Sequence, residues 1–144
     1  MMTGFGEGAL DKYWAALKEK YRERYSEVAA DHMVYPRNTE ELTEHSCFGL
    51  SYESLEENIA IWLRIENNHV SEASFSTGDC FVCTACASAL TELARGKTPQ
   101  EALLIGKQEL IDELHGLPED DHECAELAVK TLQEALNNYL ATES

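Results

Sequence analysis

The region from the middle of the chain onward limits the fold most, because strand, turn and helix patterns follow one another there without a gap. Residues 59–66 are rich in β-branched and aromatic side chains, and residues 69–77 alternate between apolar and polar. The Asn67-Asn68 pair between them is a turn signal. From Cys80 to Arg95 the periodicity becomes helical, and Gly96 follows as a typical helix end. We therefore predict an antiparallel hairpin followed by a helix, with these strand residues facing inward: Ile59, Ile61, Leu63 and Ile65.

Helical patterns flank this region on both sides. Apolar residues at spacings of three and four predict one long amphipathic helix over residues 9–30, after a flexible leader at 1–8. Thr98-Pro99 is a helix start, and residues 108–115 and 119–139 follow as a short and a long helix. The predicted fold class is α+β: a small antiparallel sheet of about three strands with helices packed on one face, in a single domain over residues 1–144.

Charge excludes some classes of partner. The formal net charge is −16, with a sequence pI near 4.5. This balance argues against nucleic acid and anionic membranes, and it favours a basic protein partner or simple solubility. The sequence shows no signal-peptide pattern and no apolar run of about 20 residues, so we expect a soluble, cytoplasmic protein.

Five cysteines are the main chemical feature. In a reducing compartment they indicate metal binding or reactivity more than disulfides. Cys80, at a strand-to-helix junction, is well placed to expose its sulfur at the positive end of the helix dipole. For Cys83 the sequence leaves ligand and core residue equally open, and Cys86 is expected to pack in the core. The remaining two, Cys47 and Cys124, lie far away in the sequence.

Cys124 stands near the start of the last helix, beside possible nitrogen and oxygen ligands. These are His122 and Glu123, while the acidic run at 119–121 is well explained as the dipole partner of the helix. Three thiolates from separate segments with one nitrogen or oxygen ligand suit zinc or an iron–sulfur cluster. Spacing alone does not choose between them.

Several short motifs, in consistent order, resemble the IscU/NifU-type iron–sulfur cluster assembly scaffold family. Asp31-His32-x-x-x-Pro36-Arg37-Asn38 matches an early motif of that family, and Cys47 falls where the family has its first cysteine. Cys80 falls at the second, at the head of a helix that closes with Arg95-Gly96-Lys97-Thr98. Leu117-Pro118 resembles the segment that leads to the third cysteine, here Cys124.

The resemblance implies a SufE/NifU-like fold and a scaffold, not an enzyme. Iron and sulfide would assemble on it into a [2Fe–2S] cluster, with sulfur delivered as persulfide by a cysteine desulfurase, before transfer to apo-proteins. The implied ligands are Cys47, Cys80 and Cys124, with Glu123 or His122 as the fourth and Cys83 as a further candidate. Monomer and homodimer both remain open.

The chain also departs from the family pattern. Gly49 stands where the family has an aspartate, and Glu123 stands where it has a histidine before the last cysteine. The acidic segment after Pro118 replaces a lysine-containing segment, which argues against the usual chaperone recognition.

Two other interpretations stay open. One is a zinc-bound sulfur acceptor that stimulates a cysteine desulfurase, because zinc can hold thiolates tetrahedrally and keep one nucleophilic. The other is an acidic interaction domain that has kept the fold and lost the metal function.

Overall fold

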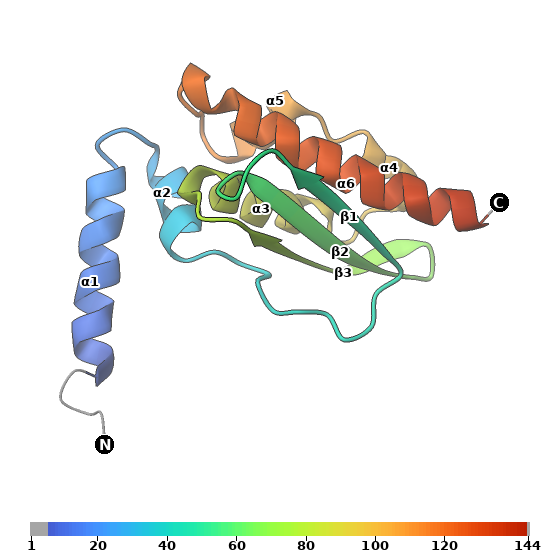
Figure 1. Ribbon diagram of the computed structural model, residues 1–144, viewed down its shortest axis with the longest axis horizontal. Helices are drawn as coiled ribbons and strands as arrows, with labels where there is room; N and C mark the ends of the chain where they lie inside the picture. Colours follow the sequence, from blue (N-terminus) through green and yellow to red (C-terminus); the bar gives the residue numbers. More distant parts are fainter. Residues whose placement is uncertain (1–5, 144) are drawn as a thin grey trace.

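The computed structural model describes residues 6–143 and shows helices packed on one face of a three-stranded sheet (Figure 1). Strands β1 (Cys47–Tyr52), β2 (Asn58–Glu66) and β3 (His69–Thr77) pair antiparallel in the order β1-β2-β3. The predicted α+β class with about three antiparallel strands is confirmed. The helical elements are α1 (Gly6–Tyr21), α2 (Glu27–Val34), α3 (Phe81–Ala94), α4 (Pro99–Leu103), α5 (Lys107–Glu113), the 3-10 helix η1 (Glu119–Asp121) and α6 (His122–Glu143).

The hairpin β2–β3 forms as the sequence predicts. Asn67 and Asn68 both adopt the left-handed backbone conformation, with φ of 54° and 60°, which a tight hairpin turn between twisted strands requires. Of the residues expected to face inward, these are fully buried: Ile59, Ile61 and Leu63. Ile65 is only partly buried, because the strand register shifts between Arg64 and Ile65.

The N-terminal helical region is two helices, not the single helix predicted over residues 9–30. α1 ends at Tyr21, and Ser26 caps a new helix by accepting a hydrogen bond from the Ala29 N–H at 2.9 Å. The Ser26 hydroxyl also donates to the Leu114 carbonyl, so a tertiary contact supports the break. Residues 1–5 of the expected leader lie outside the described residues, and the remainder of it already belongs to α1.

Hydrogen bonds from the motif at residues 31–38 connect α2 to α3 and to the sheet. His32 Nδ1 lies 2.7 Å from the Ser88 hydroxyl oxygen, which also accepts the Arg37 N–H at 2.8 Å. Asn38 has a φ of 63°, and its carbonyl accepts the Phe75 N–H at 3.0 Å. The interpretation of this segment as a helix exit and turn, with His32 at a helix end, is confirmed.

Later helix boundaries follow their local sequence closely. Gly96, with a φ of 87°, closes α3 as predicted, and Thr98 and Glu101 form a capping box around Pro99 at the start of α4. The last helix begins at His122 and not at Glu119, because residues 119–121 form η1. None of the helices within residues 6–143 is long and apolar enough to cross a membrane.

β1 packs directly on α6. A side chain at Gly49 would meet the Thr131 carbonyl oxygen at 2.3 Å, so only glycine allows the two elements to come this close. At the free edge of β1, the Glu134 carboxylate accepts the Leu50 N–H at 2.8 Å, and Asn138 donates to the Phe48 carbonyl at 3.2 Å.

The antiparallel register decides which segments meet. Tyr52 pairs with Asn58 and Ile59 with Thr77, so the end of β1, the start of β2 and the end of β3 share one end of the sheet. We call this the Thr77 end. Cys47 pairs with Leu63, near the hairpin turn, at the opposite end.

Candidate metal centre

Cys80 occupies the position immediately before α3. Its backbone is extended (φ −142°, ψ 111°), and its Sγ accepts the Cys83 N–H at 3.3 Å. Cysteine thus takes the N-cap role that Ser or Asp usually fills. The free N–H groups and the dipole of this 14-residue helix favour a thiolate here, as the sequence indicates.

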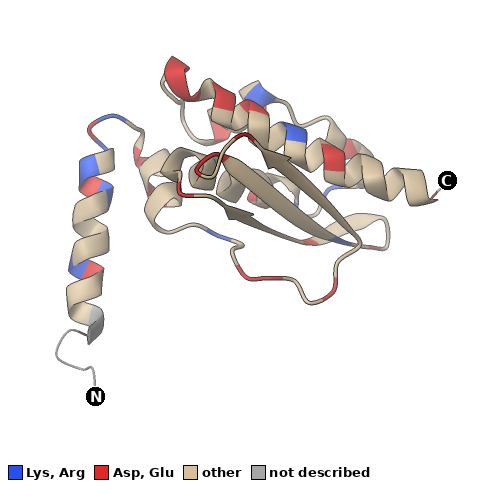
Figure 2. Cartoon of the chain, viewed as in Figure 1, with Lys and Arg blue, Asp and Glu red and all other residues tan. Residues whose placement is uncertain are grey.

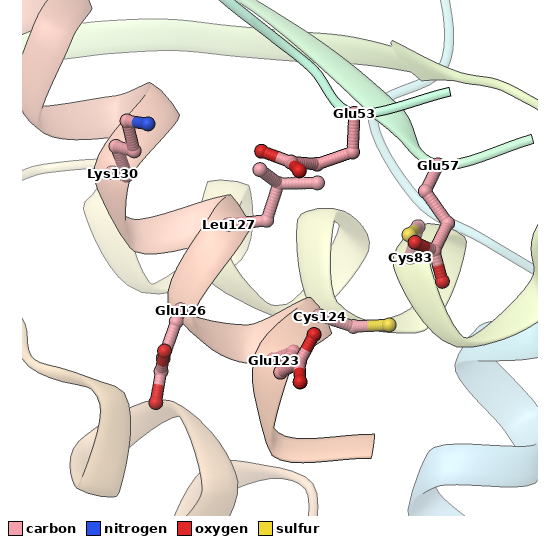
Figure 3. Close-up of a pocket in the computed structure, with 8 residues that line it drawn as sticks. All are labelled: Glu53, Glu57, Cys83, Glu123, Cys124, Glu126, Leu127 and Lys130. Atoms are coloured by element: carbon pink, nitrogen blue, oxygen red, sulfur yellow. The ribbon is translucent and has the colours of Figure 1, made fainter. Parts of the chain in front are cut away.

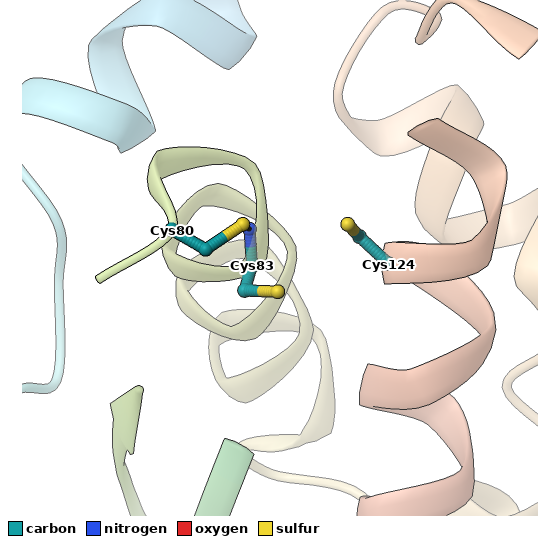
Figure 4. A group of neighbouring side chains, drawn as sticks. All are labelled: Cys80, Cys83 and Cys124. Atoms are coloured by element: carbon teal, nitrogen blue, oxygen red, sulfur yellow. Dashed lines mark hydrogen bonds between the residues drawn. The ribbon is translucent and has the colours of Figure 1, made fainter. Parts of the chain in front are cut away.

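Cys83 and Cys124 complete a group of three sulfur atoms. Cys83 lies in the first turn of α3 and Cys124 in the first turn of α6, and Figure 4 shows the three side chains directed into the space between these helices. Their Sγ atoms all lie within 4.8 Å of one another. Within residues 6–143 no other three Cys, His, Asp or Glu side chains bring their ligand atoms together in this way.

Hydrogen bonds within the group separate the acidities of the thiols. Bonds from Cys124 and Cys83 hold the pKa of Cys80 far below the usual thiol value. The same hydrogen bonds raise the pKa of Cys83. The bond between Cys124 and Cys80 raises the pKa of Cys124 to about 12. Cys80 is partly exposed while Cys83 is fully buried, so the thiol with the lowest pKa is also the one that solvent reaches.

A cleft of about 350 Å³ opens beside the group (Figure 3). Cys83 and Cys124 line its inner wall, together with the carboxylates of Glu57 and Glu123. Its other lining residues are Glu53, Glu126, Leu127 and Lys130. The negative charge of Glu57 contributes to the raised pKa of Cys124, which places this carboxylate in the electrostatic field of the sulfur group.

The β1–β2 connection that carries Glu57 is held firmly against the Thr77 end. The Glu53 N–H bonds the Glu57 carbonyl at 2.9 Å, and Asn58 Nδ2 donates to the Leu55 carbonyl at 2.9 Å. A side chain at Gly78 would meet that same carbonyl oxygen at 2.4 Å. Glycine before Cys80 therefore lets the connection approach the sulfur group.

The two expected ligands beside Cys124 lie differently. Glu123 is exposed and lines the cleft (Figure 3). His122 Nε2 lies 3.1 Å from the Leu117 carbonyl oxygen. This nitrogen donates to the carbonyl and so offers no lone pair to a metal, which leaves Nδ1 as the ring nitrogen that can act as a ligand.

The structure does not bring Cys47 to the group. It begins β1, five residues from the end of that strand, or about 17 Å along it. Its side chain faces the core at 7% exposure, and burial raises its pKa to about 12. Of the predicted ligands Cys47, Cys80 and Cys124, the structure brings the last two together and places Cys83, not Cys47, beside them. Cys86 is fully buried in the core, as expected.

Glu57 is the residue that sequence reasoning missed. It lies in a short acidic stretch with the pattern of a solvated loop. The sheet topology identifies it. Because β2 and β3 are antiparallel, the connection that precedes β2 lies at the same end of the sheet as the residues that follow β3.

Chemically, the group offers three soft ligands and a neighbouring hard one. Thiolates suit zinc and iron–sulfur clusters, and a carboxylate can complete four-coordination. Because Cys80 is partly exposed and the cleft is open, a metal or cluster bound here stays accessible to another molecule.

Comparison with known proteins assigns the family. Residues 24–144 match the family model described as the NifU-like N terminal domain. The chain belongs to this NifU-like family. The match covers α2, the sheet and every later helix, while all of α1 precedes it.

Relatives of this NifU-like chain agree with the assignment. It is 30% identical over 116 residues to an Archaeoglobus fulgidus protein named iron-sulfur cluster assembly scaffold protein IscU 1, covering 80% of this chain and 76% of that protein. It is also 30% identical over 119 residues to the Aquifex aeolicus iron-sulfur cluster assembly scaffold protein IscU, covering 81% and 76%.

Solved structures support the fold alone. A NifU-like N-terminal protein from Brucella abortus superposes with a TM-score of 0.64 at 11% identity, over 81% of this chain and 94% of that one. A putative iron-sulfur cluster assembly scaffold for the SUF system from Fervidobacterium islandicum has a TM-score of 0.62 at 18% identity, over 78% and 96%. The NifU-like fold that the motifs imply is therefore confirmed.

Proposed function

We propose that this protein is a scaffold on which iron and sulfide assemble into a cluster, with Cys80, Cys83 and Cys124 as ligands. The observation that carries the proposal is the convergence of three sulfur atoms within 4.8 Å beside an open cleft. The names of the similar proteins from Archaeoglobus fulgidus and Aquifex aeolicus support the same function. Cys47 is not part of the proposed set.

A [2Fe–2S] cluster takes four protein ligands, so one position remains for a residue of the cleft. Glu57 and Glu123 both offer a carboxylate there. Both glutamates are exposed, and we assign the position to Glu57 because hydrogen bonds fix its connection and its charge acts on Cys124. A carboxylate holds iron less firmly than a thiolate does, which suits a cluster that must later leave.

The sulfur donor in this proposal is a cysteine desulfurase, and the acceptors of the finished cluster are apo-proteins. The lining of the cleft contains four glutamates and one lysine. Such a surface attracts a partner whose contacting loop is basic and repels an acidic one.

The zinc-bound sulfur acceptor is the second candidate. Three thiolates and one carboxylate also satisfy the tetrahedral geometry of zinc, and Cys80 at the solvent side would be the thiolate that receives sulfur. Zinc would be retained here as a resident ion, whereas iron and sulfide would be cargo.

Anaerobic reconstitution separates the two candidates. The full chain is incubated with ferrous iron, cysteine and a cysteine desulfurase, desalted, and analysed for iron, acid-labile sulfide and zinc. Equal amounts of iron and sulfide with a visible sulfide-to-iron absorption support the scaffold. Stoichiometric zinc that iron does not displace, together with faster desulfurase turnover, would instead identify the sulfur acceptor.

A further inference from the structure

We infer that Cys83 releases sulfide from a persulfide carried on Cys80, so that this chain reduces incoming sulfur with its own pair of cysteines. The inference deepens the proposed function, on which it rests only for the biological origin of the sulfur. Its chemistry involves neither iron nor zinc.

The positions of the two residues give them different roles. Cys80 is partly exposed at the N-cap of α3, where a persulfide donor can reach its sulfur. Cys83 has 0% exposure, so an external donor does not reach it directly. Its backbone N–H nevertheless touches the Cys80 Sγ at 3.3 Å, and its own sulfur lies within 4.8 Å of that atom.

The spacing also permits a bond between them. Residues three apart in the first turn of a helix have Cβ atoms about 5–6 Å apart, close to the range that a disulfide spans with a small adjustment. Cys-x-x-Cys at the head of a helix is the arrangement that dithiol oxidoreductases use. The Cys124 Sγ lies within the same 4.8 Å, but Cys124 belongs to a different helix and is not part of this Cys-x-x-Cys arrangement.

The reaction balances in two steps. The Cys80 thiolate attacks the outer sulfur of an alkyl persulfide, the S–S bond of the donor breaks, and the alkyl thiolate leaves. The sulfur of Cys83 then attacks the Cys80 Sγ, its proton passes to the departing outer sulfur, and HS⁻ leaves as a Cys80–Cys83 disulfide forms. The outer sulfur gains two electrons and the two cysteines lose two.

Each sulfide therefore leaves one disulfide behind. A dithiol reductant must reopen it before the two cysteines can ligate a cluster, because a disulfide sulfur is not a thiolate ligand. This requirement links sulfide supply and cluster binding in one pair of side chains.

The test uses the full-length, reduced protein under anaerobic conditions with a metal chelator and a small excess of cysteamine persulfide. Released sulfide is measured with time, and the protein mass is measured after quenching with an alkylating agent. The wild type should release one equivalent of sulfide per chain and end with a Cys80–Cys83 disulfide in the peptide map. Cys83→Ala should lose this release and accumulate one added sulfur on Cys80.

Two control variants and a measurement of folding test whether the loss of sulfide release is specific to Cys83. Cys47→Ala and Cys86→Ala, both changes at buried cysteines outside the group of three, should release sulfide as the wild type does, and circular dichroism checks that every variant is folded. Release by Cys83→Ala at the wild-type rate, or a wild type that stops at the persulfide without a disulfide, would overturn the inference. Since the assay contains no metal, its result is independent of whether the chain assembles a cluster.

Discussion

Burial decides which cysteines are available for chemistry. Cys47 and Cys86 act as small apolar groups in the core, and burial raises the pKa of both. Cys80 differs because a helix N-terminus and two neighbouring thiols stabilise its thiolate. The useful distinction between the five residues is therefore the surroundings of each sulfur and not the spacing along the chain.

The fourth ligand can be tested by changing one carboxylate. We expect Glu57→Gln to assemble a cluster that a chelator removes about tenfold faster or more, since even the outer partners of ligands contribute that much to metal affinity. The measurement is the decay of the cluster absorption after addition of the chelator.

Glu126→Gln is the matched control. Glu126 also lines the cleft, but its carboxylate binds Lys107 at 2.8 Å and points away from the sulfur group in Figure 3. Its cluster should decay at the wild-type rate. Equal decay for Glu57→Gln and the wild type would remove Glu57 from the ligand set.

His32 makes stability depend on pH. Burial lowers the pKa of His32 in the folded chain, so the unfolded chain binds the proton more readily. The free energy of unfolding should be highest at pH values above about 6.5, the pKa of histidine in the unfolded chain. Below that pH it should fall by up to about 1.4 kcal/mol per pH unit. Urea denaturation at a series of pH values measures this slope.

The comparison variant is His32→Asn, which can still hydrogen-bond Ser88 and has no ionisable ring. Its unfolding free energy should change less between pH 6.5 and pH 5. If both proteins lose stability in parallel over this range, the titration of His32 is not responsible.

At the level of single residues, the sequence identified part of the site. Cys80 was recognisable because Gly78-Asp79 separates a strand pattern from a helix pattern, and Cys124 because it opens the last helix. For Cys83 the sequence could not distinguish a ligand from a core residue, since the residue is both buried and a member of the group of three sulfur atoms. Glu57 required the pairing of β1, β2 and β3, which local patterns do not contain.

At the level of elements, the close packing of β1 on α6 depends on one glycine. Gly49→Ala would place a methyl group 2.3 Å from the Thr131 carbonyl, so the strand or the helix must move. We expect the free energy of unfolding to fall by about 1–3 kcal/mol, the usual cost of overpacking. Urea denaturation measures it.

Gly8→Ala provides the control for this substitution. Gly8 lies in α1 with no atom within 4 Å of the added methyl group, and alanine there should stabilise the helix by at most about 1 kcal/mol. A Gly49→Ala protein as stable as the wild type would mean that β1 and α6 are not packed this closely.

Elements with their own local signals were the predictable ones. The Asn67-Asn68 turn, Gly96 and the Thr98 capping box each act within a few residues of the boundary that they set. The break between α1 and α2 was not predictable in this way. The apolar periodicity continues through it, and the contact that supports it reaches Leu114, 88 residues away.

At the level of the whole molecule, antiparallel pairing builds the site. It gathers the β1–β2 connection and the β3–α3 junction at the Thr77 end, where the start of α6 adds Cys124. Figure 2 shows acidic residues in this connection and along the start of α6. The site therefore lies in a negative region of a chain whose formal net charge is −16.

This charge predicts how a sulfur donor associates. If the donor presents a basic surface, its association rate with this protein should fall steeply as sodium chloride rises, because salt screens long-range attraction. Stopped-flow measurement at several salt concentrations gives the slope. A rate that does not change with salt would show that the acidic region does not guide the donor.

The central claim is that Cys83, and not Cys47, completes the thiolate set with Cys80 and Cys124. The most direct measurement is iron and sulfide per chain after anaerobic reconstitution of Cys47→Ala and Cys83→Ala, both folded by circular dichroism. We predict wild-type content for Cys47→Ala and loss of most of the cluster for Cys83→Ala. Loss in Cys47→Ala with wild-type content in Cys83→Ala would contradict the site described by the structure.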